Sequence, residues 1–105
     1  MELNQFIGIG EVTHDVDLNE TAQGHSVCNF NIRIIETFEV QGEQVQKDLF
    51  IRVVAWKQLA VKIHPRLKKG TKVLVIGKIV FREFESKGER KKTFEVSAID
   101  IQVQE

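Results

Sequence analysis

A chain of 105 residues with 42% hydrophobic side chains has room for one domain built around one core. The single cysteine excludes an internal disulfide and favours a reducing compartment, where Cys28 is expected to fill a small buried position of a strand. No apolar run reaches the length of a membrane span, and the N-terminus lacks the charged start of a signal peptide. We therefore expect a protein that is not exported and has no membrane partner.

The formal net charge is zero, but the charges are unevenly divided along the chain. Residues 1–46 hold eight acidic residues and one basic residue, a balance of −7. Residues 47–105 hold fourteen basic and seven acidic residues, a balance of +7. This asymmetry favours a face that binds a polyanion, although most surface charges serve only to keep a protein hydrated.

Runs with the two-residue period of β-strands dominate the first half of the chain. The first strand is expected at residues 3–14, where the glycines of FIGIGEV indicate a bulge or a sharp bend, and a polar loop follows it. The second strand is expected at residues 27–38, in which apolar and polar side chains alternate. A turn around Gly42 then leads into a third strand at residues 46–55.

One helix interrupts the strands. An apolar stripe at helical spacing predicts it over residues 57–67, with Pro65 expected to kink or fray its last turn and Gly70 expected to stop it. Two further strands are predicted at residues 72–84 and 92–103, separated by the turn-like ESKGER. The apolar parity switches within the last strand, which indicates a bulge there.

Three strands, a short helix and two long strands are the element order of an OB-fold. We therefore predict an all-β fold, a five-stranded Greek-key barrel with one short helix between strands three and four, as a single domain over residues 1–105. An open five-stranded sheet with the helix on one face is the alternative. Barrel closure is favoured because it removes the exposed edges that such long strands would present.

One face of the third predicted strand interleaves aromatic rings with a cation, while the opposite face is aliphatic and is expected to be core. Alternation groups Phe50, Arg52, Val54 and Trp56 on this face. On the next strand it groups Lys78, Arg82 and Phe84, opposite Val73, Val75, Ile79 and Phe81. Cations neutralise phosphates, and flat rings stack on bases at roughly 1–3 kcal/mol each, so this pattern suits single-stranded nucleic acid of any sequence. Alternation alone leaves a core role for each ring equally open.

At these residues the chain resembles the bacterial-type single-stranded DNA-binding proteins. The resemblance runs from residue 4 to about residue 103, through NQFIGIGEVTHDVDL, GHSVCNFNIRI and, most specifically, VVAWKQLA followed by LKKGTKVLVIGKI. It implies an OB-fold that protects single-stranded DNA during replication, recombination or repair. It also implies a homotetramer, with a dimer as the alternative, and a cytoplasmic, nucleoid-associated location.

The resemblance also assigns site residues. It places the family's base-stacking positions on Phe38, Phe50, Trp56 and Phe84. Candidates for phosphate contact are Arg33, Arg52, Lys57, Lys68, Lys69, Lys78, Arg82 and Lys87. Family members typically append a flexible tail with an acidic tip that recruits other proteins, whereas this sequence ends directly after the last predicted strand. Either a tail has been removed or the chain is a short relative without one, and tail-mediated partners are doubtful in both cases.

Other functions are open to the same sequence. An enzyme is disfavoured because the three histidines are dispersed, Cys28 has no histidine partner, and Asp15 and Asp17 are expected to be loop residues. GIG lacks the remainder of a phosphate-cradling motif. We therefore expect no catalytic residue, metal, cofactor or small-molecule substrate. An OB-fold adaptor of replication restart that acts through protein contacts is the main alternative, and RNA binding is another.

Overall fold

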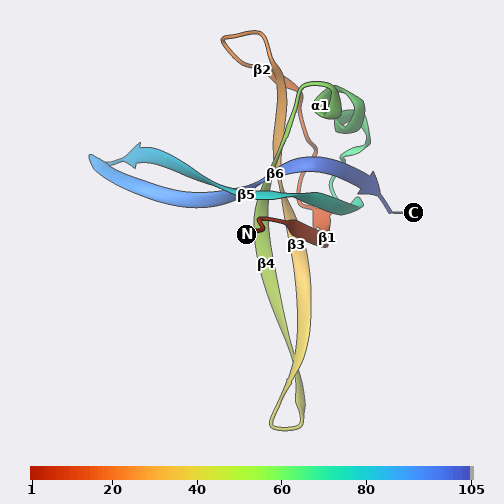
Figure 1. Cartoon of the computed structure of the whole chain (residues 1–105). Coiled ribbons are helices and arrows are strands. Elements are labelled where there is room, and N and C mark those ends of the chain that lie inside the picture. Colours follow the sequence, from red (N-terminus) through yellow and green to blue (C-terminus); the bar gives the residue numbers. More distant parts are fainter. Residues whose placement is uncertain (105) are drawn as a thin grey trace.

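Five long strands and one helix form the chain, and the computed structural model describes residues 1–104 (Figure 1). The long strands are β1 (Phe6–Val12), β3 (Ser26–Val40), β4 (Glu43–Trp56), β5 (Lys72–Ser86) and β6 (Glu89–Val103). A two-residue strand, β2 (Asn19–Glu20), lies in the polar loop, and β4 leads into α1 (Lys57–Ile63) and the 3₁₀ turn η1 (His64–Arg66).

The strands close into a barrel. Their order in the sheet is β1-β5-β6-β4-β3-β2, and β1 also pairs with β3 at Glu11↔Arg33, which closes the five long strands into a ring with β2 outside it. The pairing of β4 with β6 is parallel and short, limited to Val53↔Val96 and Val54↔Ser97, while the other ladders are antiparallel. The predicted OB-fold barrel with one short helix is confirmed.

The core lies inside the barrel and at the end that the helix covers. Inward positions of β3, β4, β5 and β6 are buried, as the sequence alternation predicts, and they include Phe30, Val53, Val75 and Val96. From α1 and the turn after it come Ala60, Ile63 and Leu67. The buried cluster therefore joins the helix to the barrel, in which α1 packs against β3, β4 and β6.

Pro65 shortens the predicted helix. The α-helix ends at Ile63 instead of residue 67, and Pro65 lies in the 3₁₀ turn that follows. Proline has no N–H to donate to the preceding turn, so the tighter winding takes over, and the Leu67 N–H bonds the His64 carbonyl at 3.1 Å. Leu67 still reaches the core. The prediction that the apolar stripe is buried is therefore confirmed, and the prediction that the helix extends to residue 67 is wrong.

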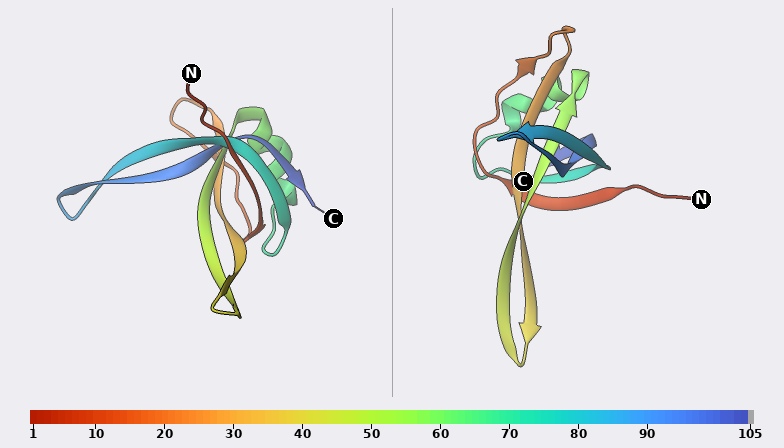
Figure 2. Two further views of the ribbon diagram at one scale, coloured as in Figure 1. Left: turned by 60° about the horizontal axis from the view of Figure 1, so that its bottom comes forward. Right: turned by 90° about the vertical axis from the view of Figure 1, so that its left-hand side faces the viewer.

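Two hairpins run beyond the barrel as arms, which project in different directions (Figures 1 and 2). The first is the outer part of β3–β4 and the second the outer part of β5–β6, and both extend further than the sequence predicts. Their turns, Gln41-Gly42 and Lys87-Gly88, place both residues at positive φ. This geometry is that of the type I′ turn, whose twist matches that of two adjoining antiparallel strands.

The β5–β6 ladder contains the bulge that the parity switch predicts. The register moves from Ile76↔Asp100 to Gly77↔Ala98, which leaves Ile99 as the extra, exposed residue. At β1 the outcome differs, because its ladder with β5 is continuous through the glycines. A Cβ at Gly10 would lie 2.9 Å from the Arg33 carbonyl oxygen. Close approach to β3, and not a bulge, therefore explains this glycine.

Candidate nucleic-acid interface

The outer surfaces of β4, β6 and β5 form one continuous face. In the sheet β6 lies between β4 and β5, so the two strands with predicted aromatic-basic faces are separated only by β6. Arg52 on β4 donates from Nε to Glu95 Oε2 on β6 at 3.0 Å, and Glu95 lies opposite Val80 on β5. Side chains two residues from Val80 share its face. We call this surface the binding face; it carries Phe50, Arg52, Trp56, Lys78, Arg82 and Phe84.

The rings of the binding face are open to solvent. Phe50, Trp56 and Phe84 are all exposed, although each would gain free energy by burial in a core. Val54, between two of them in sequence, is buried, so that one position departs from the predicted pattern. Exposed aromatic side chains gathered on one face indicate a surface that binds a partner.

Arg82 and Phe84 already contact each other. The Arg82 guanidinium lies 5.6 Å from the centre of the Phe84 ring, within the range of a cation–π interaction. Both residues lie on the β5–β6 arm, beyond the barrel, where alternation places them on the same face of β5. A cation beside a stacking ring can meet the phosphate of the nucleotide whose base the ring supports.

Phe38 lies on the other face of the β3–β4 arm. It pairs with Val45 and shares the parity of Ile34, which packs against the core, whereas Phe50 pairs with Arg33 on the outer side. Phe38 is exposed because the arm has left the barrel at that point. The register thus brings Phe50, but not Phe38, onto the binding face.

The other predicted phosphate contacts are spread over the molecule. Arg33 lies directly across from Phe50 and forms an ion pair with Asp48 at 3.6 Å. Lys57 begins α1 with a positive φ, and Lys87 occupies the turn of the β5–β6 arm. These residues border the binding face or its arms.

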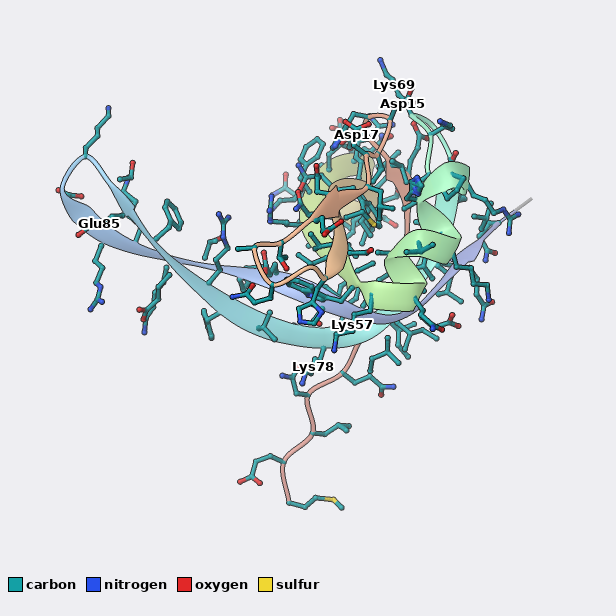
Figure 3. All side chains as sticks on the ribbon, turned by 90° about the horizontal axis from the view of Figure 1, so that it is seen from above. Asp15, Asp17, Lys57, Lys69, Lys78 and Glu85 are labelled. Carbon is teal, nitrogen blue, oxygen red and sulfur yellow. The ribbon has the colours of Figure 1, made fainter. Side chains whose placement is uncertain are left out.

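Lys68 and Lys69 lie elsewhere, in the loop before β5. The Lys69 N–H bonds Asp15 Oδ1 at 2.8 Å, and both residues lie across the barrel from Lys57 and Lys78 (Figure 3). Lys69 and Arg33 line one shallow depression on the outside of β1 and β3. The structure therefore places Lys69 on the side of the barrel away from Lys57 and Lys78.

Two groups considered for chemistry, Asp15 and Cys28, are respectively hydrogen-bonded and buried. Asp15 is a loop residue, as expected, and its carboxylate accepts the Lys69 N–H. Among residues 1–104, no cluster of three His, Cys, Asp or Glu side chains could hold a metal ion. Cys28 is buried, and desolvation raises the pKa of its thiol from 9.0 to about 11. A thiol in this environment is a poor nucleophile at neutral pH.

Sequence reasoning missed the acidic partners and the second apolar surface of the arm. Glu95 and Asp48 form ion pairs with two of the predicted phosphate-binding arginines, and only the strand register reveals either pairing. Ile79 and Phe81 are exposed, although they continue the parity of the core residue Val75, because the arm has no barrel interior beneath it. In the sequence, Ile79 and Phe81 therefore mark the part of β5 that continues beyond the barrel as an arm.

Comparisons with known proteins point to one family. The sequence profile of the Single-strand binding protein family matches residues 3–104. A single-stranded DNA-binding protein of Oceanobacillus iheyensis is 37% identical over 97 residues, which cover 92% of this chain and 58% of the relative. One of Streptococcus mutans is 31% identical over 104 residues, covering 98% and 63%. The chain thus spans about three fifths of the length of these curated relatives.

Solved structures agree. A deletion mutant of the single-stranded DNA binding protein from Thermus aquaticus superposes with a TM-score of 0.88 at 28% identity, covering 98% of this chain and 51% of that one. The Plasmodium falciparum SSB in complex with ssDNA shares the fold, with a TM-score of 0.89 at 23% identity and coverage of 100% and 97%. Among the described residues, no helix is long and apolar enough to cross a membrane. From the match over residues 3–104, the chain belongs to the Single-strand binding protein family.

Proposed function

We propose that this chain binds single-stranded DNA without sequence preference, stacking bases on the rings of the binding face and neutralising phosphates with its cations. The observation that carries the proposal is the exposure of Phe50, Trp56 and Phe84 on one continuous outer surface, interleaved with arginine and lysine. Stacking is indifferent to base identity, and cations track a phosphate backbone. Membership of the family, whose curated relatives are named for this activity, supports it.

The remaining basic residues are proposed as outer phosphate contacts. Arg33 and Lys57 border the binding face, and Lys87 lies at the end of the β5–β6 arm. Lys68 and Lys69 would be reached by DNA that continues around the barrel past Arg33. Phe38 would receive a base only from DNA that passes to the other face of the β3–β4 arm.

A titration with oligonucleotides of graded length tests the proposal. Labelled oligo-dT is expected to bind the isolated chain tightly, with a duplex of the same length binding far more weakly because its bases are already stacked. Oligo-U serves as the RNA competitor. No binding of oligo-dT would overturn the proposal and favour an adaptor that acts through protein contacts, and tighter binding of oligo-U would indicate an RNA-binding protein.

We also propose that the chain assembles as a homotetramer. Ile7 and Ile9 on the outer face of β1 pair with Ile76 and Leu74 of β5, and the bulged Ile99 of β6 is exposed as well. Most of β1 pairs only with β5, which leaves the other edge of the strand unpaired. An exposed apolar face beside an open edge favours association with a second copy. Sedimentation equilibrium is expected to give the mass of four chains, and Ile9→Asp to reduce it.

Finally, we infer that residues 1–105 act as one DNA-binding domain without catalytic chemistry, in the cytoplasm with the nucleoid. One buried cluster connects the helix with all five long strands, which supports a single domain. The occupied Asp15 and the raised thiol pKa of Cys28 support a binding role. Incubation with labelled DNA and Mg²⁺ is expected to leave the DNA intact, and cleavage would overturn the inference.

A further inference from the structure

Arg52 on β4 and Glu95 on β6 form an ion pair beside the short ladder between these two strands. The parallel ladder between β4 and β6 consists of Val53↔Val96 and Val54↔Ser97, and the ion pair lies immediately before it on both strands. Arg52 Nε donates to Glu95 Oε2 at 3.0 Å, the length of a well-formed hydrogen bond. The pair thus lies on the binding face, beside the seam of the barrel.

The carboxylate lies deeper than the guanidinium. The Glu95 side chain is 15% exposed, whereas that of Arg52 is 35% exposed. A guanidinium carries five N–H donors in a planar fork, and the bond to Glu95 uses the one on Nε. The terminal nitrogens therefore have donors left for a phosphate. Glu95 thus bonds the guanidinium from the more buried side and leaves the Arg52 side chain partly exposed to solvent.

Arg52 also lies between two stacking rings. On the outer side of β4, Phe50 precedes Arg52 by two residues and Trp56 follows it by four, and both rings are exposed. A nucleic-acid strand with bases on both rings would carry its backbone past Arg52. An arginine that is already held in place loses less side-chain freedom when it binds a phosphate than one that moves freely.

We propose that Glu95 is a positioning residue for DNA binding, which fixes the Arg52 guanidinium so that its terminal nitrogens meet a phosphate between the bases on Phe50 and Trp56. The inference rests on the proposed function and adds to it a role for an acidic residue. Acidic side chains on a DNA-binding face ordinarily weaken binding by repelling phosphates. For Glu95, the DNA affinity gained by fixing the Arg52 guanidinium exceeds the affinity lost through that repulsion.

The chain supplies a matched control in Arg33 and Asp48. This second arginine–carboxylate pair also borders Phe50, but its atoms are 3.6 Å apart and both side chains are 37% exposed. A long contact between equally exposed groups does not fix the guanidinium. Asp48→Ala is therefore expected to leave DNA affinity unchanged or to tighten it.

The experiment is a double-mutant cycle on oligo-dT affinity, read by the anisotropy of labelled DNA. Glu95→Ala is expected to weaken binding about three- to tenfold, the effect of releasing one side chain that must be ordered again. Adding it to Arg52→Ala is expected to cause no further loss, within about twofold. Glu95→Gln is expected to restore most of the affinity, because its amide oxygen still accepts from Nε. Thermal unfolding of each variant shows whether it is folded.

Each other outcome overturns the inference. If Glu95→Ala and Glu95→Gln both bind more tightly, the carboxylate competes with DNA. Losses that add independently of Arg52 would show that Glu95 acts elsewhere. A lower melting temperature with unchanged affinity per folded molecule would give it a structural role alone. Wild-type protein that fails to bind oligo-dT overturns the proposed function itself, whereas binding that Glu95→Ala leaves unchanged removes only the positioning role.

Discussion

Phe81 and Phe84 lie three positions apart on the β5–β6 arm, and this odd spacing places them on opposite faces of β5. Phe84 is 37% exposed and lies beside Arg82 on the binding face. Phe81 is 73% exposed and lies across from Phe94 of β6 on the other face. The more exposed of the two rings is thus the one that lies off the binding face. The arm therefore carries three exposed phenylalanines, of which only Phe84 lies on the binding face.

Phe84→Ala is expected to weaken oligo-dT binding by about 1–3 kcal/mol, the free energy of stacking one base. Phe81→Ala is expected to leave affinity unchanged, because its ring faces away from the binding face. Fluorescence anisotropy with labelled oligo-dT measures both. Equal losses in the two variants would show that the arm binds DNA on both faces, or that the substitutions act by loosening the hairpin.

The single tryptophan reports directly on the site. Trp56 ends β4 and is exposed on the binding face. We expect saturation with oligo-dT to quench its fluorescence strongly, since a stacked base lies against the indole ring. Phe50→Ala should weaken binding while leaving the quenching at saturation intact. Trp56 fluorescence that does not change at saturation would remove this residue from the set of stacking positions.

The fold could be predicted from the sequence because its main signals are local. Alternation on β3 and β4 and the helical stripe before Leu67 each depend on neighbours along the chain. The length of the arms could not be predicted, since alternation continues after the barrel interior ends. The partner of Arg52 could not be predicted either, because the parallel contact of β4 with β6 joins residues more than forty positions apart.

The site was predictable to a different degree at each residue. Alternation and register agree that Phe50 and Arg52 share a face, and the pairing across β6 adds Phe84 to it. Phe38 rests on family resemblance alone, and its parity places it on the other face of its arm. Lys69 was predicted from charge, a signal that does not distinguish one side of a barrel from the other.

The salt dependence of binding tests the basic residues of the binding face. The logarithm of affinity should fall with the logarithm of salt concentration by about 0.7 for each phosphate neutralised on a single strand. Lys78→Gln is expected to reduce this slope by up to about 0.7. Lys62→Gln, on the exposed side of α1, makes the same charge change outside the binding face and should leave the slope unchanged. A slope that responds equally to both would indicate only a general charge effect.

Gly77 is expected to tolerate no side chain. It is buried at the bulge of the β5–β6 ladder, where a Cβ would collide with the Ser97 carbonyl oxygen and lie 2.9 Å from Val96 Cγ1. Because one of these atoms is backbone, relief requires the strands to move. Gly77→Ala is therefore expected to lower the free energy of unfolding by about 1–3 kcal/mol in chemical denaturation. Gly88→Asn, in an open turn with positive φ, should cost less.

Cys28 links stability to alkaline pH. Burial raises the pKa of the folded thiol to about 11, whereas in the unfolded chain it is expected to titrate near the ordinary value of 9.0. The unfolded state therefore loses the proton first. The stability contribution of this thiol is complete below pH 9 and disappears progressively as the pH rises toward 11.

With the folded pKa about two units above 9.0, the free energy of unfolding should fall by about 1.5 kcal/mol more in the wild type than in Cys28→Ala between pH 9 and pH 10.5. Urea denaturation at several pH values measures this difference. The difference between the two proteins isolates the contribution of the thiol. Cys28→Ala is expected to start lower because it leaves a small cavity, an offset that does not depend on pH. Parallel pH profiles for the two proteins would mean that the thiol ionises in the folded barrel as easily as it does in water.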